Sequence, residues 1–136
     1  MIVVDTGPVV ALGNARDVAH EPCRCLLRTH PGPLLLPEPV LGEIGYVLWR
    51  RAGTRAEAAF HRDVARGLYE LVSLGREGAA RVAELVEKYS DLPLGTADAY
   101  VIATAEKYGA REVATLDRKH FSLVRPRHIE AFTLLP

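Results

Sequence analysis

Three acidic side chains occupy positions near the expected ends of strands or helices, and a fourth lies inside an expected helix. Asp5 follows a β-branched apolar run, and Asp117 follows a second short apolar run. Asp98 falls in the first turn of an expected helix, where a negative charge suits the helix dipole. Glu43 lies among apolar residues and glycines of another expected helix. Burying carboxylates beside so much apolar surface is costly unless a positive charge offsets them.

The chemistry that such a set supports is binding of a hard divalent cation. Several carboxylates within a few ångströms of one another cannot all stay ionised without a cation. Ligand sets made only of oxygen select ions such as Mg²⁺ or Mn²⁺, and such a centre suits hydrolysis of a phosphodiester. Asp91 is a fifth candidate. Taken singly, Asp98 is better explained by the helix dipole, and Asp117 by capping of the next turn; the case for a site depends on the whole set.

Other kinds of site are excluded by what the sequence lacks. It has no Cys/His spacing typical of zinc, no phosphate-binding or dinucleotide glycine motif and no serine nucleophile elbow. A dehalogenase-like phosphatase requires a second acid two residues after the first, where this chain has Gly7. A receiver domain requires a phosphorylatable aspartate after a middle strand, where this chain has Leu36 and Pro37.

The elements that must position the acids alternate between short apolar strands and amphipathic helices. This alternation predicts right-handed crossovers and a mostly parallel sheet between helices. Because ligands of such sheets bind beyond the carboxyl ends of the strands, Asp5 and Asp117 are expected at one rim. Strands are expected at 2–4, 34–36, 69–73, 112–116 and 131–134, with a turn at 118–121. Helices are expected at 9–12, 20–28, from Pro37 or Pro39 to Gly53, from Thr54 through Leu68, at 75–89, and from Thr96 to Gly109.

Local signals predict how some helices begin and end. Thr96 is the expected N-cap of the helix that carries Asp98, and Gly109 is its expected stop signal. Thr54 and Glu57 have the spacing of a capping box. Among the charged residues of that next helix, Asp63 is expected to be a solvated partner of a neighbouring arginine.

Length and composition indicate one globular domain spanning residues 1–136. The formal net charge is zero, which does not indicate a strongly basic nucleic-acid module. Cys23 and Cys25 fit neither a zinc knuckle nor a redox motif, and we expect them to be reduced in a cytoplasmic protein. No signal peptide or apolar run long enough to cross a membrane is expected.

Four stretches carry a resemblance to a known family. They read MIVVDT at 1–6, PEPVLGEIGYVL at 37–48, DLPLGTADA at 91–99 and VATLDRKHF at 113–121. With the closing segment 125–136, they make the chain resemble the PIN-domain nucleases, and specifically the VapC-type toxin ribonucleases of toxin–antitoxin pairs. The resemblance covers nearly the whole chain and implies a three-layer α/β/α sandwich.

The resemblance also implies a role for individual residues. Asp5, Glu43, Asp98 and Asp117 match the acidic quartet of the family, which binds Mg²⁺ or Mn²⁺. Thr115 matches a hydroxyl residue that steadies a metal-bound water, and Thr6 matches the small polar residue after the first aspartate. Gly7 departs from the family, in which serine or asparagine is more usual at this position.

The function implied by the resemblance is metal-dependent endonucleolytic hydrolysis of RNA by the toxin of a toxin–antitoxin pair. A homodimer and a small antitoxin that blocks the site are implied as well. Two alternatives stay open: a non-catalytic PIN module that binds RNA or protein, and a PIN nuclease directed at DNA. Two basic groups are candidates for holding flanking phosphates, namely Arg118, Lys119, Arg125 and Arg127, or Arg50, Arg51 and Arg55.

Overall fold

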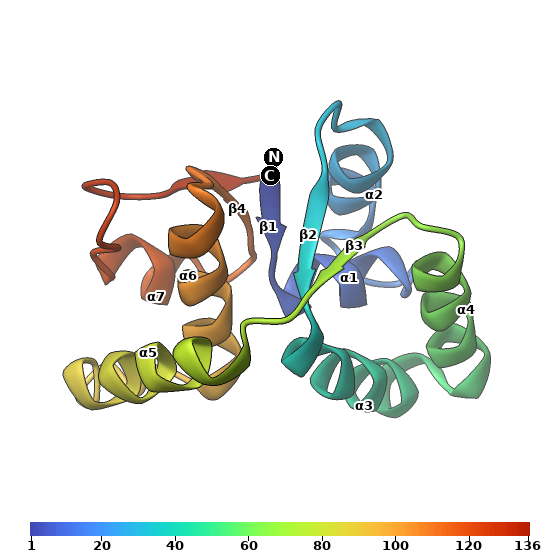
Figure 1. The fold of residues 1–136 in the computed structure, drawn as a ribbon. Coiled ribbons are helices and arrows are strands. Elements are labelled where there is room, and N and C mark those ends of the chain that lie inside the picture. The colour runs from blue at the N-terminus through green and yellow to red at the C-terminus, as the bar shows by residue number, and fades with distance from the viewer.

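The fold is built on one five-stranded sheet in which every strand pairing is parallel (Figure 1). A computed structural model describes residues 1–136. The strand order is β3-β2-β1-β4-β5, so β1 is central and β3 and β5 form the edges. The expectation of a mostly parallel sheet is therefore confirmed. The strands are β1 (Ile2–Val4), β2 (Leu34–Pro37), β3 (Glu70–Val72), β4 (Glu112–Ala114) and β5 (Thr133–Leu135).

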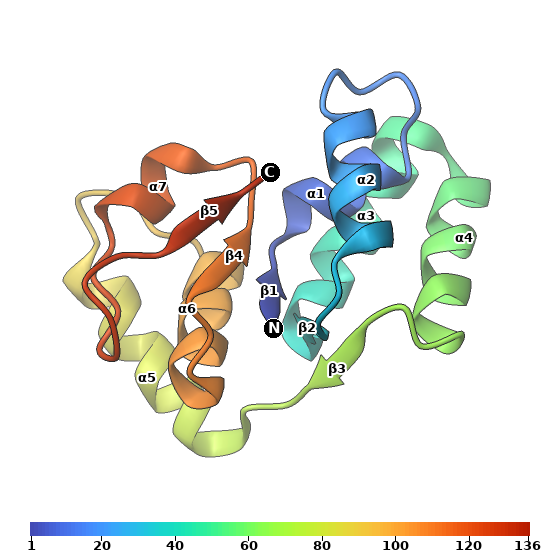
Figure 2. The same ribbon diagram turned by 90° about the horizontal axis from the view of Figure 1, so that it is seen from above.

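Helices form the two outer layers of an α/β/α sandwich (Figures 1 and 2). Helices α1 to α4 lie in the connections from β1 to β2 and from β2 to β3. Helices α5 and α6 lie in the long crossover from β3 to β4, and α7 connects β4 to β5. The first group is α1 (Thr6–Leu12), α2 (His20–Thr29), the 3₁₀ turn η1 (Glu38–Val40), α3 (Leu41–Ala52) and α4 (Thr54–Ala65). The second group is α5 (Gly75–Lys88), α6 (Thr96–Tyr108) and α7 (Arg118–Leu123).

The core forms because the central strands are apolar on both faces. Every residue of β1 and β2 is buried, as parallel strands covered on both sides require. Helix α6 packs against β1 and β2. Six of its residues, Ala99 and 101–105, are buried, and the helix has almost no polar face. Its nearly uniform apolar character is explained by this central position.

Strands β1 and β4 are neighbours, although they are separated by most of the chain. Val4 pairs with Ala114, and the Asp5 amide donates to the Ala114 carbonyl at 2.9 Å. The connections from β1 and from β4 lead to opposite sides of the sheet. The two strands therefore flank the topological switch point, where ligands of such sheets usually bind.

Several predicted boundaries were wrong by a few residues. Helix α1 begins at Thr6 rather than Val9. Strand β4 ends at Ala114 rather than Leu116, because the Asp117 amide donates to the Thr115 side chain instead of to a neighbouring strand. The turn expected at 118–121 is the start of α7, and a 3₁₀ turn precedes α3. The third and last strands run over 70–72 and 133–135 instead of 69–73 and 131–134.

Two predicted helix caps were also wrong. Gly95, not Thr96, is the N-cap of α6, because the Asp98 carboxylate accepts a hydrogen bond from the Gly95 amide at 3.1 Å. Gly53 takes the corresponding position of α4 at φ +86°, so Thr54 already lies inside that helix and makes no cap bond. Gly109 does end α6 in the left-handed conformation, as predicted.

The prediction for Asp63 was partly wrong. It does pair with arginines, but its side chain is only 18% exposed because Arg28 reaches across to it from α2. Arg66 approaches the other carboxylate oxygen from the same helix, at 3.9 Å. Asp63 therefore lies between helices rather than on a solvated face.

No helix in the structure has the length and apolar character needed to span a membrane.

The central position of α6 is tested by removing a buried side chain from it. Ile102 is fully buried, so Ile102→Ala is expected to lower the free energy of unfolding by about 2–5 kcal/mol through lost burial and a residual cavity. Leu123→Ala, at a position that is 54% exposed, is the control and is expected to cost less than about 1 kcal/mol. Urea denaturation measures both, and equal losses would contradict the assignment of α6 to the core.

Candidate metal centre

The first acid of the quartet is a buried carboxylate held by a neighbouring strand. Asp5 follows β1 and is only 5% exposed. Its Oδ2 accepts a hydrogen bond from the Thr115 hydroxyl at 2.8 Å. Thr115 Oγ1 in turn accepts from the Asp117 amide at 3.0 Å. The Thr115 hydroxyl thus donates its hydrogen bond to Asp5, and Thr115 links the ends of β1 and β4.

The acid after β4 caps the helix that follows it. Asp117 is the N-cap of α7, and its Oδ1 accepts from the His120 amide at 3.0 Å. Its Oδ2 makes a short contact with His120 Nδ1. The other ring nitrogen, Nε2, lies 2.8 Å from the Leu92 carbonyl oxygen and therefore donates to it. The imidazole consequently joins Asp117 to the turn that precedes α6.

The α6 acid lies within reach of these groups. Oxygen or nitrogen atoms of Asp98, Asp117 and His120 all lie within 4.8 Å of one another. Capping of the α6 N-terminus fixes one oxygen of Asp98 on the Gly95 amide. The two aspartates therefore meet at the carboxyl edge of the sheet, with an imidazole beside them.

The fourth acid enters from the opposite helical layer. Glu43 lies in the first turn of α3 and is exposed. Its Oε2 accepts a hydrogen bond from the hydroxyl of Thr6, the first residue of α1. Since Thr6 follows Asp5 directly, this bond ties Glu43 to the end of β1.

The pKa values show that these charges act on one another. Burial raises the pKa of Asp5 from 3.8 to about 6; the Thr115 hydrogen bond opposes this, and the charges of Asp98 and Glu43 add to it. Burial likewise raises the pKa of Asp98, with a contribution from Asp117. The hydrogen bond to Asp117 raises the pKa of His120, which favours the imidazolium form. No Lys or Arg pairs with any of the four acids.

The donor set fits a hard cation. All four acids offer carboxylate oxygens, the ligands that Mg²⁺ and Mn²⁺ prefer. Both ring nitrogens of His120 are engaged by Asp117 and Leu92. The histidine is therefore placed to orient a carboxylate rather than to bind an ion directly.

The auxiliary residues differ in where they lie. Asp91 is exposed in the turn between α5 and α6 and makes no hydrogen bond or ion pair, and it is not part of the group around Asp98.

Gly7 lies against Leu116: an added Cβ would stand 3.3 Å from the Leu116 Cβ. The close approach explains why a glycine suits this position in the present chain.

His120 is the site residue that sequence reasoning missed. The sequence predicts only a turn at this position, and the role of His120 follows from α7, which brings its ring against the Asp117 carboxylate. The signal available was its spacing, because an aspartate N-cap and a histidine three residues later face one another at the start of a helix.

Comparison with known proteins agrees with this geometry. A family model described as the PIN domain matches residues 2–125. The chain belongs to the PIN-domain family. Ribonuclease VapC26 of Mycobacterium tuberculosis is 33% identical over 135 residues, covering 99% of this chain and 100% of that protein. A shorter match, 42% identical over 59 residues, joins 43% of this PIN-domain chain to 45% of the 23S rRNA-specific endonuclease VapC20 of the same species.

Three solved structures share the fold. M. tuberculosis VapC20, described as a sarcin–ricin loop cleaving toxin, superposes with a TM-score of 0.77 at 26% identity, over 83% of this chain and 87% of that one. VapBC2 from Rickettsia felis, bound to a promoter DNA fragment, gives a TM-score of 0.68 at 16% identity, with 100% of both chains covered. FitAcB from Neisseria gonorrhoeae gives 0.64 at 18% identity, over 100% and 97%.

The raised pKa of Asp5 leads to a prediction about pH and stability. A carboxyl that binds its proton more tightly when folded destabilises the folded state as pH rises from about 4 towards 7. In EDTA at pH 7.5, Asp5→Asn is therefore expected to be more stable than the parent chain, by up to about 3 kcal/mol for a shift of this size. At pH 4.5 the advantage should shrink. Urea denaturation at both pH values measures it, and a pH-independent difference would contradict the burial of an ionisable Asp5.

Proposed function

We propose that this PIN-domain protein is an Mg²⁺- or Mn²⁺-dependent endoribonuclease and the toxin of a toxin–antitoxin pair. The observation that carries the proposal is the buried carboxylate of Asp5 beside the charges of Asp98 and Glu43, with no Lys or Arg partner. A divalent ion is the counter-charge that this arrangement lacks. Asp5, Glu43, Asp98 and Asp117 are the residues that would hold it.

The chemistry supplied by a bound divalent ion is Lewis acidity, which lowers the pKa of water and stabilises charge on a phosphoryl oxygen. The protein contributes a fixed frame of carboxylates. Thr115 holds Asp5 and the backbone of Asp117, while Thr6 holds Glu43. Each hydroxyl fixes the orientation of an acid before any substrate arrives, which lowers the cost of ordering the site.

No residue is placed to act as a covalent nucleophile. No serine lies in the group of acids, and the two threonine hydroxyls donate their protons to carboxylates. The two cysteines lie on α2, away from the carboxyl edge. Direct hydrolysis of the phosphodiester by water is the reaction that these groups support.

The choice of RNA rests on the relatives. VapC26 is named a ribonuclease and VapC20 a 23S rRNA-specific endonuclease. VapC20, whose fold superposes with a TM-score of 0.77, is described as a toxin that cleaves the sarcin–ricin loop. We propose the same substrate class here, with a cognate antitoxin as the protein partner, as in the VapBC2 and FitAcB complexes.

The nuclease assignment is tested by removing one charge from the quartet. Asp98→Asn is near-isosteric, so the fold should persist while divalent binding fails. Losing several kcal/mol of transition-state stabilisation is expected to slow Mg²⁺-dependent cleavage of total RNA by about a hundredfold or more. Gel analysis with Mg²⁺, Mn²⁺ and EDTA measures it. Retained cleavage by a folded Asp98→Asn protein would refute the assignment.

Asp91→Asn is the matched control because it removes the same charge in the same stretch of chain. Asp91 is exposed and makes no contact with the other acids, so its variant is expected to cleave at the parent rate within about twofold. If Asp91→Asn were as inactive as Asp98→Asn, Asp91 would belong to the metal centre after all.

A further inference from the structure

We propose that two adjoining hollows lined by arginines bind the RNA strand that flanks the cleavage position. This inference rests on the proposed function and names how the same substrate is held. The lining arginines, which we call the arginine track, come from α2, α3, α4 and the loop after α1. They are Arg16, Arg28, Arg51, Arg55, Arg62 and Arg66.

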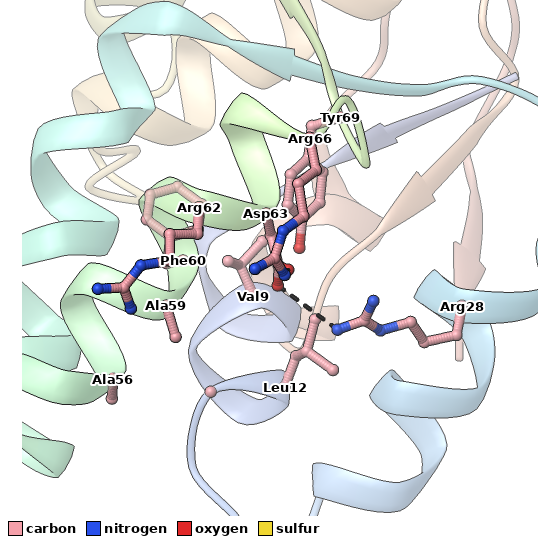
Figure 3. Close-up of a pocket in the computed structure, with 11 residues that line it drawn as sticks. Val9, Leu12, Arg28, Ala56, Ala59, Phe60, Arg62, Asp63, Arg66 and Tyr69 are labelled. Carbon is pink, nitrogen blue, oxygen red and sulfur yellow. Dashed lines mark hydrogen bonds and ion pairs between the residues drawn. The ribbon is translucent and has the colours of Figure 1, made fainter.

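The first hollow lies between α1, α2 and α4 and has a volume of about 410 Å³ (Figure 3). Val9, Leu12 and Phe60 contribute apolar wall, and Arg28, Arg62 and Arg66 contribute the charge. Asp63 is the only acid in the lining, and its two arginine contacts are long, at 3.5 and 3.9 Å. These arginines therefore keep donors free for another anion.

The second hollow, of about 530 Å³, adjoins the first. Gly13 and Ala56 line both hollows, so the two are continuous at the C-terminal end of α1. Arg16, Arg51 and Arg55 line the second hollow, which contains no acid. None of the three makes an ion pair anywhere in the structure, and all three are exposed.

The charge of this surface stands out against the rest of the molecule. Six arginines and one aspartate line the two hollows, while the whole chain has a formal net charge of zero. The positive charge is therefore gathered on one face, which is the electrostatic footprint of a polyanion-binding surface. A formal net charge of zero for the whole chain does not reveal this local excess of positive charge.

A buried donor points the same way. The Tyr69 hydroxyl is buried and has no hydrogen-bond partner, although its residue lines the first hollow beside Asp63 and Arg66 (Figure 3). Burial raises the pKa of Tyr69, so the hydroxyl keeps its proton. An unpaired buried donor is costly, and an anionic oxygen entering the hollow is the partner that this donor lacks.

Of the basic candidates outside the two hollows, Lys119 and Arg50 are exposed and make no ion pair, whereas the other three are engaged within the fold. Arg118 donates to the Pro136 carbonyl, Arg127 pairs with Glu84, and Arg125 donates to the Ser122 and Val124 carbonyls. Arg51, by contrast, is free and lies eight residues after Glu43 on α3, about 12 Å along the helix axis. A short length of RNA backbone spans this separation, so one strand can contact both the acids and the arginine track.

The test is the salt dependence of RNA binding. The variant Arg16→Ala/Arg51→Ala/Arg55→Ala removes three charges that make no ion pair in the fold. Its affinity for a fluorescein-labelled single-stranded RNA is compared with that of the parent, both carrying Asp98→Asn, in EDTA by anisotropy. Each lost phosphate contact flattens the slope of log K against log salt by about 0.7. The triple variant is therefore expected to lose about 2 from the slope and to bind about tenfold more weakly or worse at 0.1 M salt.

The matched control removes three positive charges elsewhere. Arg76, Lys88 and Arg111 are exposed and lie outside both hollows, so their triple alanine variant is expected to keep nearly the parent slope. Equal slopes and affinities for the two triple variants would overturn the proposal. It would also be overturned if the track variant bound RNA normally but lost a co-expressed antitoxin, because the surface would then be a protein interface. Binding is read without cleavage, so loss of the nuclease assignment would leave this result interpretable.

Discussion

The hydrogen bond from Thr115 to Asp5 is the interaction on which the site depends. It joins the ends of β1 and β4 across the switch point of the sheet and holds a carboxylate that burial disfavours in its charged form. Thr115 also accepts from the Asp117 amide, so the same side chain places the first and last acids of the quartet. The rest of the fold serves this arrangement: parallel pairing brings the two strand ends together, and α6 and α3 add Asp98 and Glu43 from opposite layers.

Much of this arrangement follows from the sequence, because parallel strands place the residues after them at one rim. Asp5 and Asp117 both follow short apolar runs, so their proximity was predictable without any relative. Asp98 was placed correctly in the first turn of α6. The error in the cap had a local cause, since its carboxylate bonds the Gly95 amide and moves the cap from Thr96 to Gly95. The roles of Glu43 and Thr6 required the fold, because their contact joins residues 37 positions apart.

The remaining features depend on side-chain packing that no local pattern specifies. His120 belongs to the site because α7 places its ring in contact with both Asp117 and the Leu92 carbonyl. The arginine track combines residues from four segments, and composition hid it behind a net charge of zero. The partial burial of Asp63 likewise arises from contact between α2 and α4. Long-range contacts of this kind are set by how elements that are far apart in the sequence pack against one another.

The most direct test of the metal centre is a crystal structure of the protein soaked in Mn²⁺, with the ion located by anomalous scattering. The account predicts one or two peaks at the carboxyl edge of β1 and β4, coordinated by oxygens of Asp5, Glu43, Asp98 and Asp117. It also predicts that Asp91 and the nitrogens of His120 take no part in coordination. A peak coordinated by other residues, or an empty edge at Mn²⁺ concentrations that support cleavage, would contradict the central claim.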